Sequence, residues 1–176
     1  MTATIMTPLE ILEAPDRRLT TVCAPVERID VELLRLLDAM LETMYAAPGI
    51  GLAAPQVGVL KRAFVIDLGE AGERAPRFVI NPELIWHSES LTVAEEGCLS
   101  LPQQFGEVAR PDQVRVRYRD RTGEIQEIDA EGLLARCLQH EIDHLNGILF
   151  VDHLSALKRT MILRRLAKAK RTRQSA

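Results

Sequence analysis

The sequence predicts a single α+β domain, in which mainly antiparallel strands surround a central helix. The chain has 176 residues, an ordinary length for one domain, and shows neither an internal repeat nor a low-complexity linker. Segments with helical spacing flank several segments of strand composition, without the alternation typical of βαβ units. We expect residues 1–154 to form the body, and residues 155–176 to add a basic helix and tail to the same domain.

The first helix is expected over residues 30–45. Asp30 is suited to be its N-cap, because a carboxylate there accepts hydrogen bonds from the free amides of the first turn. Apolar side chains recur at helical spacing along one face, at Leu33, Leu37, Met40 and Met44. Pro48 and Gly49 then end the helix.

Strand composition begins at residue 61. Residues 61–68 and 77–84 are rich in β-branched and aromatic side chains, and a turn containing Gly and Glu separates them. Residues 90–102 also contain strand-forming side chains, with a break expected at Gly97. These segments predict strands between the two long helices.

The clearest strand signal lies at residues 112–120, where Val and Tyr alternate with Arg. This alternation indicates one buried and one exposed face. A turn at residues 121–123 then leads into residues 124–130, so we expect the two segments to pair as a hairpin.

A second long helix is expected over residues 131–146, with Gly147 following its C-cap. One stripe of this helix carries both histidines and consists of Leu133, Cys137, His140, Glu141 and His144. The stripe beside it is apolar and consists of Leu134, Leu138, Ile142 and Leu145. We therefore expect the helix to be buried over much of its circumference, with both imidazoles pointing inward.

A last amphipathic helix is expected from about residue 155 to residue 170. Eight of the 22 basic residues, and none of the 25 acidic ones, lie between residues 155 and 176. One face of this helix could pack on the body while the other meets phosphates or acidic protein. The alternative is a solvated helix face with a frayed end.

The overall composition excludes several classes of protein. A net charge of −3 argues against a generally basic nucleic-acid-binding protein, so we expect no specific DNA binding. Three cysteines without disulfide spacing favour a reducing compartment. Neither a membrane-spanning apolar stretch nor a secretory signal is evident, so we expect a cytoplasmic protein that does not bind membranes.

The stretch "QHEIDHLNGILF", residues 139–150, contains the pattern H-E-x-x-H. Histidines one turn apart on a helix can bind one ion, with each nitrogen about 2.0–2.1 Å from it. Glu141, next to the first histidine, can then reach a water bound to that ion. The alternative is a buried helix with two hydrogen-bonded core histidines and a surface glutamate.

A catalytic metal site of this kind needs a third protein ligand. Metzincins have a His three residues beyond the Gly that corresponds to Gly147, but Phe150 occupies that position. Thermolysin-type proteins use a Glu from a downstream helix, and the one carboxylate after His144 is Asp152, too near in sequence to reach the same ion. His153 remains possible, but these exclusions favour a ligand from upstream.

The upstream candidates are Cys23, His87 and Cys98. Cys98 is favoured because Gly97 permits close approach of the backbone, and the residues that follow can present amides to a substrate. His87 lies at an expected strand end and has no such setting. A lone cysteine is more often a small buried apolar side chain, which is our interpretation of Cys23 and Cys137. With the two histidines, Cys98 would leave one metal position open, as in catalytic sites.

Three segments together resemble the peptide deformylase family. The family motifs are G-φ-G-φ-A-A-x-Q, E-G-C-L-S and Q-H-E-x-D-H. The chain reads "GIGLAAPQ" at residues 49–56, "EGCLS" at residues 96–100 and "QHEIDH" at residues 139–144. Their order and spacing also fit, and the likeness covers nearly the whole chain.

The resemblance implies an α+β hydrolase, with its catalytic part in residues 1–154, that removes the formyl group from N-formylmethionyl peptides emerging from ribosomes. A metal lowers the pKa of its bound water, and a carboxylate takes the proton and returns it to the leaving amine. The roles that the resemblance assigns are metal ligands Cys98, His140 and His144, general base and acid Glu141, oxyanion donors Gln56 and the backbone N–H of Leu99, and substrate-binding residues Ile50, Gly51 and Gly97.

The resemblance also implies a cofactor and a partner. The expected cofactor is one divalent metal ion per chain, usually Fe²⁺, with Zn²⁺, Ni²⁺ or Co²⁺ able to occupy the site. The basic C-terminal segment is similar to that of the Gram-negative-like subgroup. In related deformylases such a helix docks near the ribosomal exit tunnel, so we expect the ribosome to bind residues 155–170.

One departure from the family pattern concerns the substrate. Many members carry an Arg at the position of Phe105, where it helps to hold the peptide, and Phe105 cannot donate hydrogen bonds. Two other hypotheses stay open beside a deformylase: a ribosome-associated protein with a structural metal, and a broader metallopeptidase or amidase. Glu141 favours the deformylase over the first of these, because a structural site needs no carboxylate there.

Overall fold

The structure is a computed structural model that describes residues 7–176 of the chain. Three α-helices appear in these residues: α1 (Val31–Ala46), α2 (Gly132–Leu145) and α3 (Ala156–Gln174). Three short 3₁₀ helices accompany them: η1 (Arg17–Thr20), η2 (Ala54–Val57) and η3 (Phe150–His153). Each predicted helix is therefore confirmed, although α3 continues beyond the expected end at residue 170.

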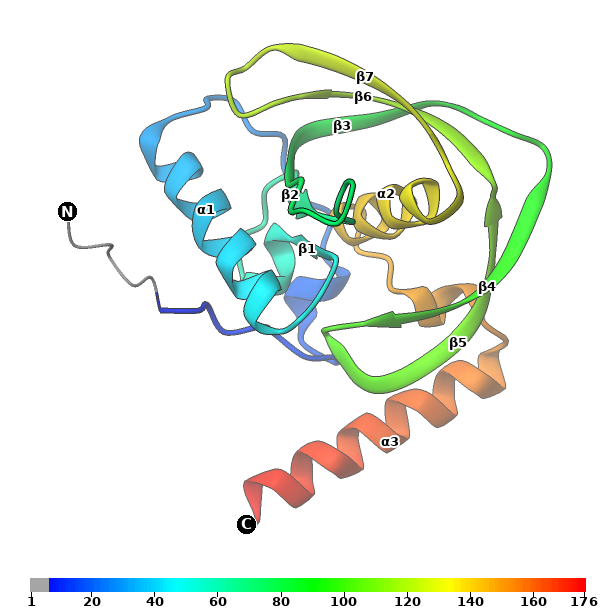
Figure 1. The fold of residues 1–176 in the computed structure, drawn as a ribbon. Coiled ribbons are helices and arrows are strands. Elements are labelled where there is room, and N and C mark those ends of the chain that lie inside the picture. The colour runs from blue at the N-terminus through cyan, green and yellow to red at the C-terminus, as the bar shows by residue number, and fades with distance from the viewer. Residues whose placement is uncertain (1–6) are drawn as a thin grey trace.

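The strands form two antiparallel sheets. Five strands pair in the order β1-β2-β3-β6-β7, with bounds Gly51–Ala53, Ala63–Ile66, Arg77–His87, Gln113–Arg119 and Ile125–Glu131. The other two strands, β4 (Leu91–Cys98) and β5 (Leu101–Pro111), form a separate hairpin. The strands curve around α2, which lies at the centre of the molecule (Figure 1). The predicted α+β class is thus confirmed.

The first helix and the central helix cover opposite faces of the larger sheet. Asp30 caps α1, since its carboxylate accepts a hydrogen bond from the Leu33 amide at 2.9 Å. Along β2, Ala63 and Val65 pack with the apolar face of α1, whereas Phe64 and Ile66 pack with α2. The inner strand β2 is therefore buried on both faces, and the sheet fixes the position of α2.

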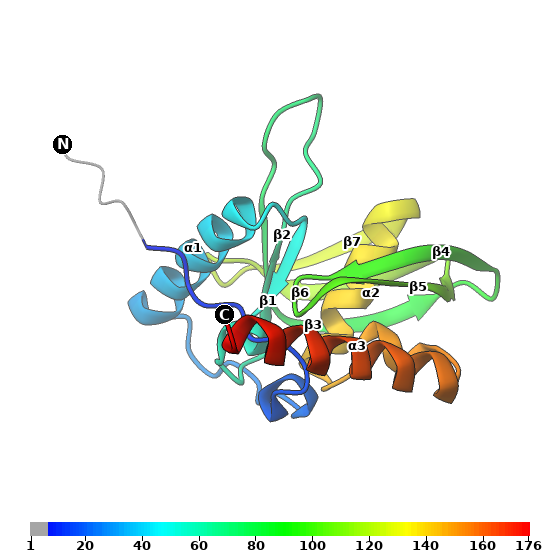
Figure 2. The same cartoon turned by 90° about the horizontal axis from the view of Figure 1, so that it is seen from below.

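The basic helix α3 packs on the body through only part of its surface. Ile162 and Leu166 are buried in a third apolar cluster, together with Val108 of β5 and Phe150 of η3. Figure 2, which views the molecule from below, shows α3 lying across this face. The basic side chains of α3 are exposed, so the helix presents a charged outer surface.

Two predictions about the strands need correction. The expected break at Gly97 is wrong, because β4 continues to Cys98 and only the pairing register shifts between these two residues. The long strand β5 was not expected, because its composition of Gln, Gly and Pro is unusual for a strand. Its pairing with β4 and the contacts of its buried residues with η3 and α3 outweigh that composition.

None of the helices in the described residues is both long and apolar enough to span a membrane.

Candidate metal centre and substrate pocket

Helix α2 supplies two histidines and a glutamate to one site. The rings of His140 and His144 lie one turn apart, with centroids 5.0 Å from each other and an interplanar angle of 71°. His144 and Glu141 are buried. Leu133, predicted to lie on the same inward stripe, is instead exposed, because it belongs to the first turn of the helix, at the mouth of the pocket.

The third side chain comes from the end of β4. The Sγ atom of Cys98 lies 3.3 Å from Nε2 of His144. The ligand atoms of Cys98, His140 and His144 all lie within 4.8 Å of one another. Within residues 7–176, this is the one group of three or more His, Cys, Asp or Glu side chains that meets such a distance limit.

These three side chains fit a divalent cation. Two ligands of a tetrahedral ion, with bonds of about 2.0–2.3 Å, are separated by about 3.5 Å, close to the sulfur–nitrogen distance between Cys98 and His144. In the described part of the chain, the buried side-chain polar atoms without a hydrogen-bond partner are Glu141 Oε2 and His144 Nδ1, both at this site. Buried polar atoms usually have partners, so the free Glu141 oxygen indicates that the site is complete only with a bound group. His144 Nδ1 lies on the far side of the ring from Nε2, the nitrogen that faces Cys98.

The protonation of the two imidazoles also fits a cation. Burial opposes a charge on His140, but the neighbouring Cys98 and Glu96 raise the pKa of this ring well above its usual value. Burial and the adjacent charge of His140 lower the pKa of His144 far below its usual value. A cation bound at these nitrogens would compete with protons for them, so metal binding is expected to weaken as pH falls.

Glu141 approaches the backbone of β1 so closely that a side chain at Gly51 would displace its carboxylate. A Cβ atom added to Gly51 would lie 2.9 Å from Cδ of Glu141 and closer still to its Oε1. Burial raises the pKa of the Glu141 carboxyl to about 7, although the charge of His140 opposes this. A cation nearby would lower this pKa again by its own charge.

A buried network of ion pairs holds the first histidine in place. His140 Nδ1 donates to Glu96 Oε1 at 2.9 Å, which leaves Nε2 to face Cys98 and His144. Arg110 donates to both oxygens of Glu96, at 2.6 and 2.9 Å, and Arg136 donates to Oε2 at 2.6 Å. Burial alone would raise the pKa of Glu96, but the bonds from Arg110 and His140 hold it well below its usual range.

This network is the part of the site that sequence reasoning did not find. Glu96 belongs to the recognised "EGCLS" segment, but no role was expected for it, and Arg110 and Arg136 lie outside the motifs. Arg136 also donates to the carbonyl oxygens of Val108 and Thr92. It therefore ties α2 to both strands of the hairpin that carries Cys98.

The amide of Gln56 lies beside the cluster of Cys98, His140 and His144, and both its oxygen and its nitrogen are hydrogen-bonded. Its Oε1 accepts a hydrogen bond from the Ala53 amide at 2.9 Å. Its Nε2 donates to Ser100 Oγ at 3.0 Å and lies 3.6 Å from Cys98 Sγ. Leu99 occupies the turn between β4 and β5 and lines the same pocket.

A pocket of about 550 Å³ opens next to these side chains. It is lined by residues 48–51, by Gln56, Cys137, His140 and Glu141, and by both strands of the β4–β5 hairpin. The expected substrate-binding residues Ile50, Gly51 and Gly97 all belong to this lining. Gly97 makes room for Phe105 on the opposite strand, since a Cβ at Gly97 would lie 2.8 Å from the ring.

The other cysteines and histidines of the chain do not belong to this group of three. The His87 ring contacts the carbonyl of Ser88 at the end of β3, and His153 Nε2 lies 2.8 Å from Asp143 Oδ2. Cys23 and Cys137 are buried thiols whose pKa burial raises. Both behave as the small apolar side chains that were predicted.

We predict that Glu96→Gln weakens both the fold and the metal site. Breaking a buried ion pair costs about 3–5 kcal/mol, because it leaves charges without partners. Losing the carboxylate behind a metal-binding histidine lowers metal affinity about 10–100-fold. Denaturant unfolding and metal competition with a chelator measure the two effects. As control, Asp129→Asn breaks the exposed Arg115 pair and should change both quantities only slightly. Equal effects of both variants would contradict the assigned role of Glu96.

The chain is similar to known proteins over nearly its whole length. Residues 8–160 match the family model described as polypeptide deformylase. The chain is 56% identical to the peptide deformylase of Rhizorhabdus wittichii over 172 residues, covering 94% of this chain and 97% of that one. It is also 56% identical to that of Rhizobium meliloti over 167 residues, covering 94% and 95%.

Solved structures show the same fold. The peptide deformylase of Ehrlichia chaffeensis in complex with actinonin has a TM-score of 0.90 at 43% identity, with 94% of this chain and 99% of that chain covered. The enzyme of Legionella pneumophila has a TM-score of 0.89 at 47% identity, covering 97% and 99%. The chain therefore belongs to the peptide deformylase family, the metallohydrolases that remove the N-formyl group from nascent peptides.

Proposed function

We propose that this chain hydrolyses the formamide bond of N-formylmethionyl peptides at a cation held by Cys98, His140 and His144. The observation that supports this most strongly is the buried, unpartnered Glu141 oxygen beside the three ligand atoms. Three protein ligands leave a tetrahedral cation one open position, the arrangement of a catalytic site. When bound, the cation would act as a Lewis acid and would lower the pKa of a water bound to it toward neutrality.

Glu141 has the position and surroundings of a general base and acid. Its unpartnered oxygen can accept the proton of the attacking water and later return it to the departing amine. The close backbone of Gly51 limits the movement of this carboxylate. Glu141 therefore acts from a fixed position without being a metal ligand itself.

Gln56 and Leu99 are the proposed donors to the oxyanion that forms when the formyl carbon becomes tetrahedral. The Gln56 amide is held by Ala53 and Ser100, so its N–H groups keep one orientation. The N–H of Leu99 is the second donor, from the turn beside Cys98. Removing one donor of this kind typically costs about 10²–10³ in rate.

The pocket walls explain a preference for the formyl group. Ile50, Gly51 and Gly97 are the proposed substrate-binding residues, and two of these three have no side chain. The backbone can therefore approach the reacting carbon closely. A formyl group carries only hydrogen on its carbonyl carbon, whereas an acetyl group adds a methyl that this narrow wall would exclude.

The metal is proposed to be Fe²⁺ in the cell. A Cys-His-His set also suits Zn²⁺, Ni²⁺ or Co²⁺, since softness and geometry permit several ions. Elemental analysis of protein purified without oxygen identifies the ion. One equivalent of iron is expected, and one equivalent of another metal would overturn this assignment without affecting the ligands.

Formate release tests the proposed activity directly. Metal-loaded protein should release formate from formyl-Met-Ala under anaerobic conditions and should leave acetyl-Met-Ala intact. No formate from a fully loaded sample would refute the activity and would favour a structural metal. Equal hydrolysis of both peptides would instead favour a broader amidase.

The basic helix α3 is proposed to bind the ribosome, near the point where formylated chains emerge. Its exposed basic side chains suit ribosomal RNA phosphates, while Ile162 and Leu166 anchor it to the body. In this proposal residues 1–154 perform the catalysis, residues 155–176 deliver the enzyme to its substrate, and the reaction takes place in the cytoplasm.

We predict that replacing Arg164, Arg165 and Lys168 together by Gln weakens ribosome binding and flattens its salt dependence. These side chains are exposed, so the change keeps the buried face of α3. Co-sedimentation with ribosomes at salt concentrations between about 50 and 200 mM measures the effect. Over this range, the affinity of a protein that makes many phosphate contacts falls by roughly 10³ or more. The matched control replaces exposed Arg28, Arg35 and Arg77 by Gln. Equal ribosome binding by both triple variants would show that α3 is not the ribosome-binding surface.

A further inference from the structure

Asp143 of the "QHEIDH" motif and the exposed His153 have no part in the proposed reaction, yet both belong to the network behind His140. Arg110 donates to Asp143 Oδ2 at 2.9 Å through one nitrogen, while its other two nitrogens hold Glu96. His153 Nε2 lies 2.8 Å from the same Asp143 oxygen. An ionised carboxylate can only accept, so His153 is the donor. Hydrogen bonds therefore connect the surface residue His153 to the His140 ring without a break.

This network becomes more exposed with distance from His140. The side chains of Glu96 and Arg110 are almost fully buried, whereas that of Asp143 is 18% exposed. The side chain of His153 is 34% exposed. A partly exposed carboxylate can exchange a protein donor for water at little cost. Because His153 donates to the oxygen that Arg110 also contacts, it opposes the loss of that contact to water.

Asp143 also balances charge behind the metal ligands. Arg110 and Arg136 both pair with the carboxylate of Glu96. Asp143 supplies a second negative charge through its ion pair with Arg110. Without it, two guanidinium groups would share one carboxylate in a buried network, next to a site for a cation. Positive charges close to such a site oppose cation binding, so the contact between Asp143 and Arg110 should favour it.

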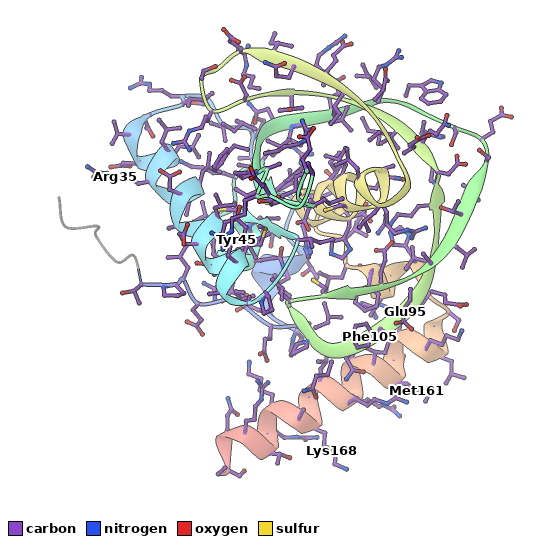
Figure 3. The ribbon with its side chains drawn as sticks, viewed as in Figure 1. Arg35, Tyr45, Glu95, Phe105, Met161 and Lys168 are labelled. Carbon is purple, nitrogen blue, oxygen red and sulfur yellow. The ribbon has the colours of Figure 1, made fainter. Side chains whose placement is uncertain are left out.

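The packing of η3 fixes the position of His153. Phe150, at the start of η3, is buried in the apolar cluster that η3 shares with α3. Asp152 accepts a hydrogen bond from Arg159 of α3 at 2.8 Å. In Figure 3, η3 lies between the end of α2 and the start of α3, beside the β4–β5 hairpin that it contacts. His153 is thus presented to Asp143 by a segment that is packed on several sides.

We propose that His153 is a positioning residue for the metal centre. It holds Asp143 against Arg110. Arg110 in turn keeps Glu96 in the orientation that accepts the hydrogen bond from His140 Nδ1. A histidine whose ring is held in this way binds a metal more tightly, because its orientation is set before the metal arrives. This proposal rests on the proposed metal site, and in it His153 contacts neither metal nor substrate.

Metal affinity tests this role. His153→Phe keeps a ring but removes the donor, and it should lower the affinity for Co²⁺ by about three- to tenfold in chelator competition. This loss should be smaller than the roughly 10–100-fold typical of a residue bonded to the ligand itself, because other residues lie between. His153→Gln should restore the affinity, since its amide N–H lies as many bonds from the backbone as Nε2. Equal affinity of the Phe variant and the original chain would overturn the proposal.

His87→Phe is the matched control. His87 is likewise exposed, and its ring contacts the carbonyl of Ser88, outside the network. This variant should keep the Co²⁺ affinity of the original chain. The visible absorption bands of bound Co²⁺ report the geometry of its ligands, so they should shift in His153→Phe and stay unchanged in His87→Phe. Equal losses of affinity in both variants would refute a specific role of His153.

A double-mutant cycle tests the route through Asp143. Asp143→Asn should weaken Co²⁺ binding more than His153→Phe does, and combining the two should cause no further loss, because His153 acts through that carboxylate. Additive losses would refute this route. A lower free energy of unfolding in His153→Phe, with unchanged affinity and absorption bands, would show a structural role alone and overturn the proposal. If the original chain bound no Co²⁺, the proposed metal site would have failed instead.

Discussion

Replacement of Glu141 by Gln should abolish most of the activity and leave the metal bound. The amide keeps the shape that fits against Gly51 but cannot take a proton from water. General acid–base catalysis contributes about 10²–10⁴ in rate, so kcat should fall by that factor with little change in KM. Formate release and metal content of the same sample measure both quantities. Substantial activity in a fully loaded variant would contradict the role of Glu141.

The same variant should make the metal-free protein more stable at alkaline pH. Burial raises the pKa of Glu141 to about 7, so the folded chain holds this proton more tightly than the unfolded chain. Ionisation of such an acid opposes folding. The penalty is absent below the usual pKa near 4.5, grows with pH, and is complete above about 7. Urea unfolding should therefore show a gain for Glu141→Gln at pH 8 and none at pH 4.5.

Replacement of Cys98 by Ala should remove the metal and, with it, the activity. Loss of a residue that only hydrogen-bonds to a metal ligand lowers metal affinity about 10–100-fold. Loss of a ligand itself should therefore lower the affinity further. The two histidines on α2 would remain but could not hold the ion alone at ordinary metal concentrations. Chelator competition measures the change in affinity, and formate release measures its consequence.

Cys23→Ala is the matched control for this change. Cys23 is a buried thiol, whereas Cys98 is half-buried. The Cys23 sulfur lies 3.9 Å from the carbonyl of Thr21, and Cys23 does not line the pocket. The control should keep one metal per chain and normal activity. If Cys98→Ala also retained full metal occupancy, Cys98 would be removed from the ligand set.

Local sequence signals predict much of this molecule. Asp30 and the periodic apolar residues behind it fix α1 within one residue at each end, because capping and burial act on neighbouring positions. The spacing of His140 and His144 places both rings in one site for the same reason. The alternation of Val and Arg along β6 gives its buried face directly.

Contacts between distant residues are what the sequence does not reveal. β5 is a strand because it pairs with β4 and packs against η3 and α3, and its own composition argues against it. The Glu96 network joins residues 14 and 40 positions apart in the chain. No local pattern predicts that Arg110 and Arg136 meet the same carboxylate, since only the packed fold brings them together.

Titration of the metal-free chain with Fe²⁺ under anaerobic conditions, with formate release from formyl-Met-Ala as the signal, tests the central claim most directly. The claim is that one cation, held by Cys98, His140 and His144, carries out the reaction. Activity should rise linearly and stop increasing at one equivalent of metal per chain. Activity without metal, or a plateau at any other stoichiometry, would contradict this account.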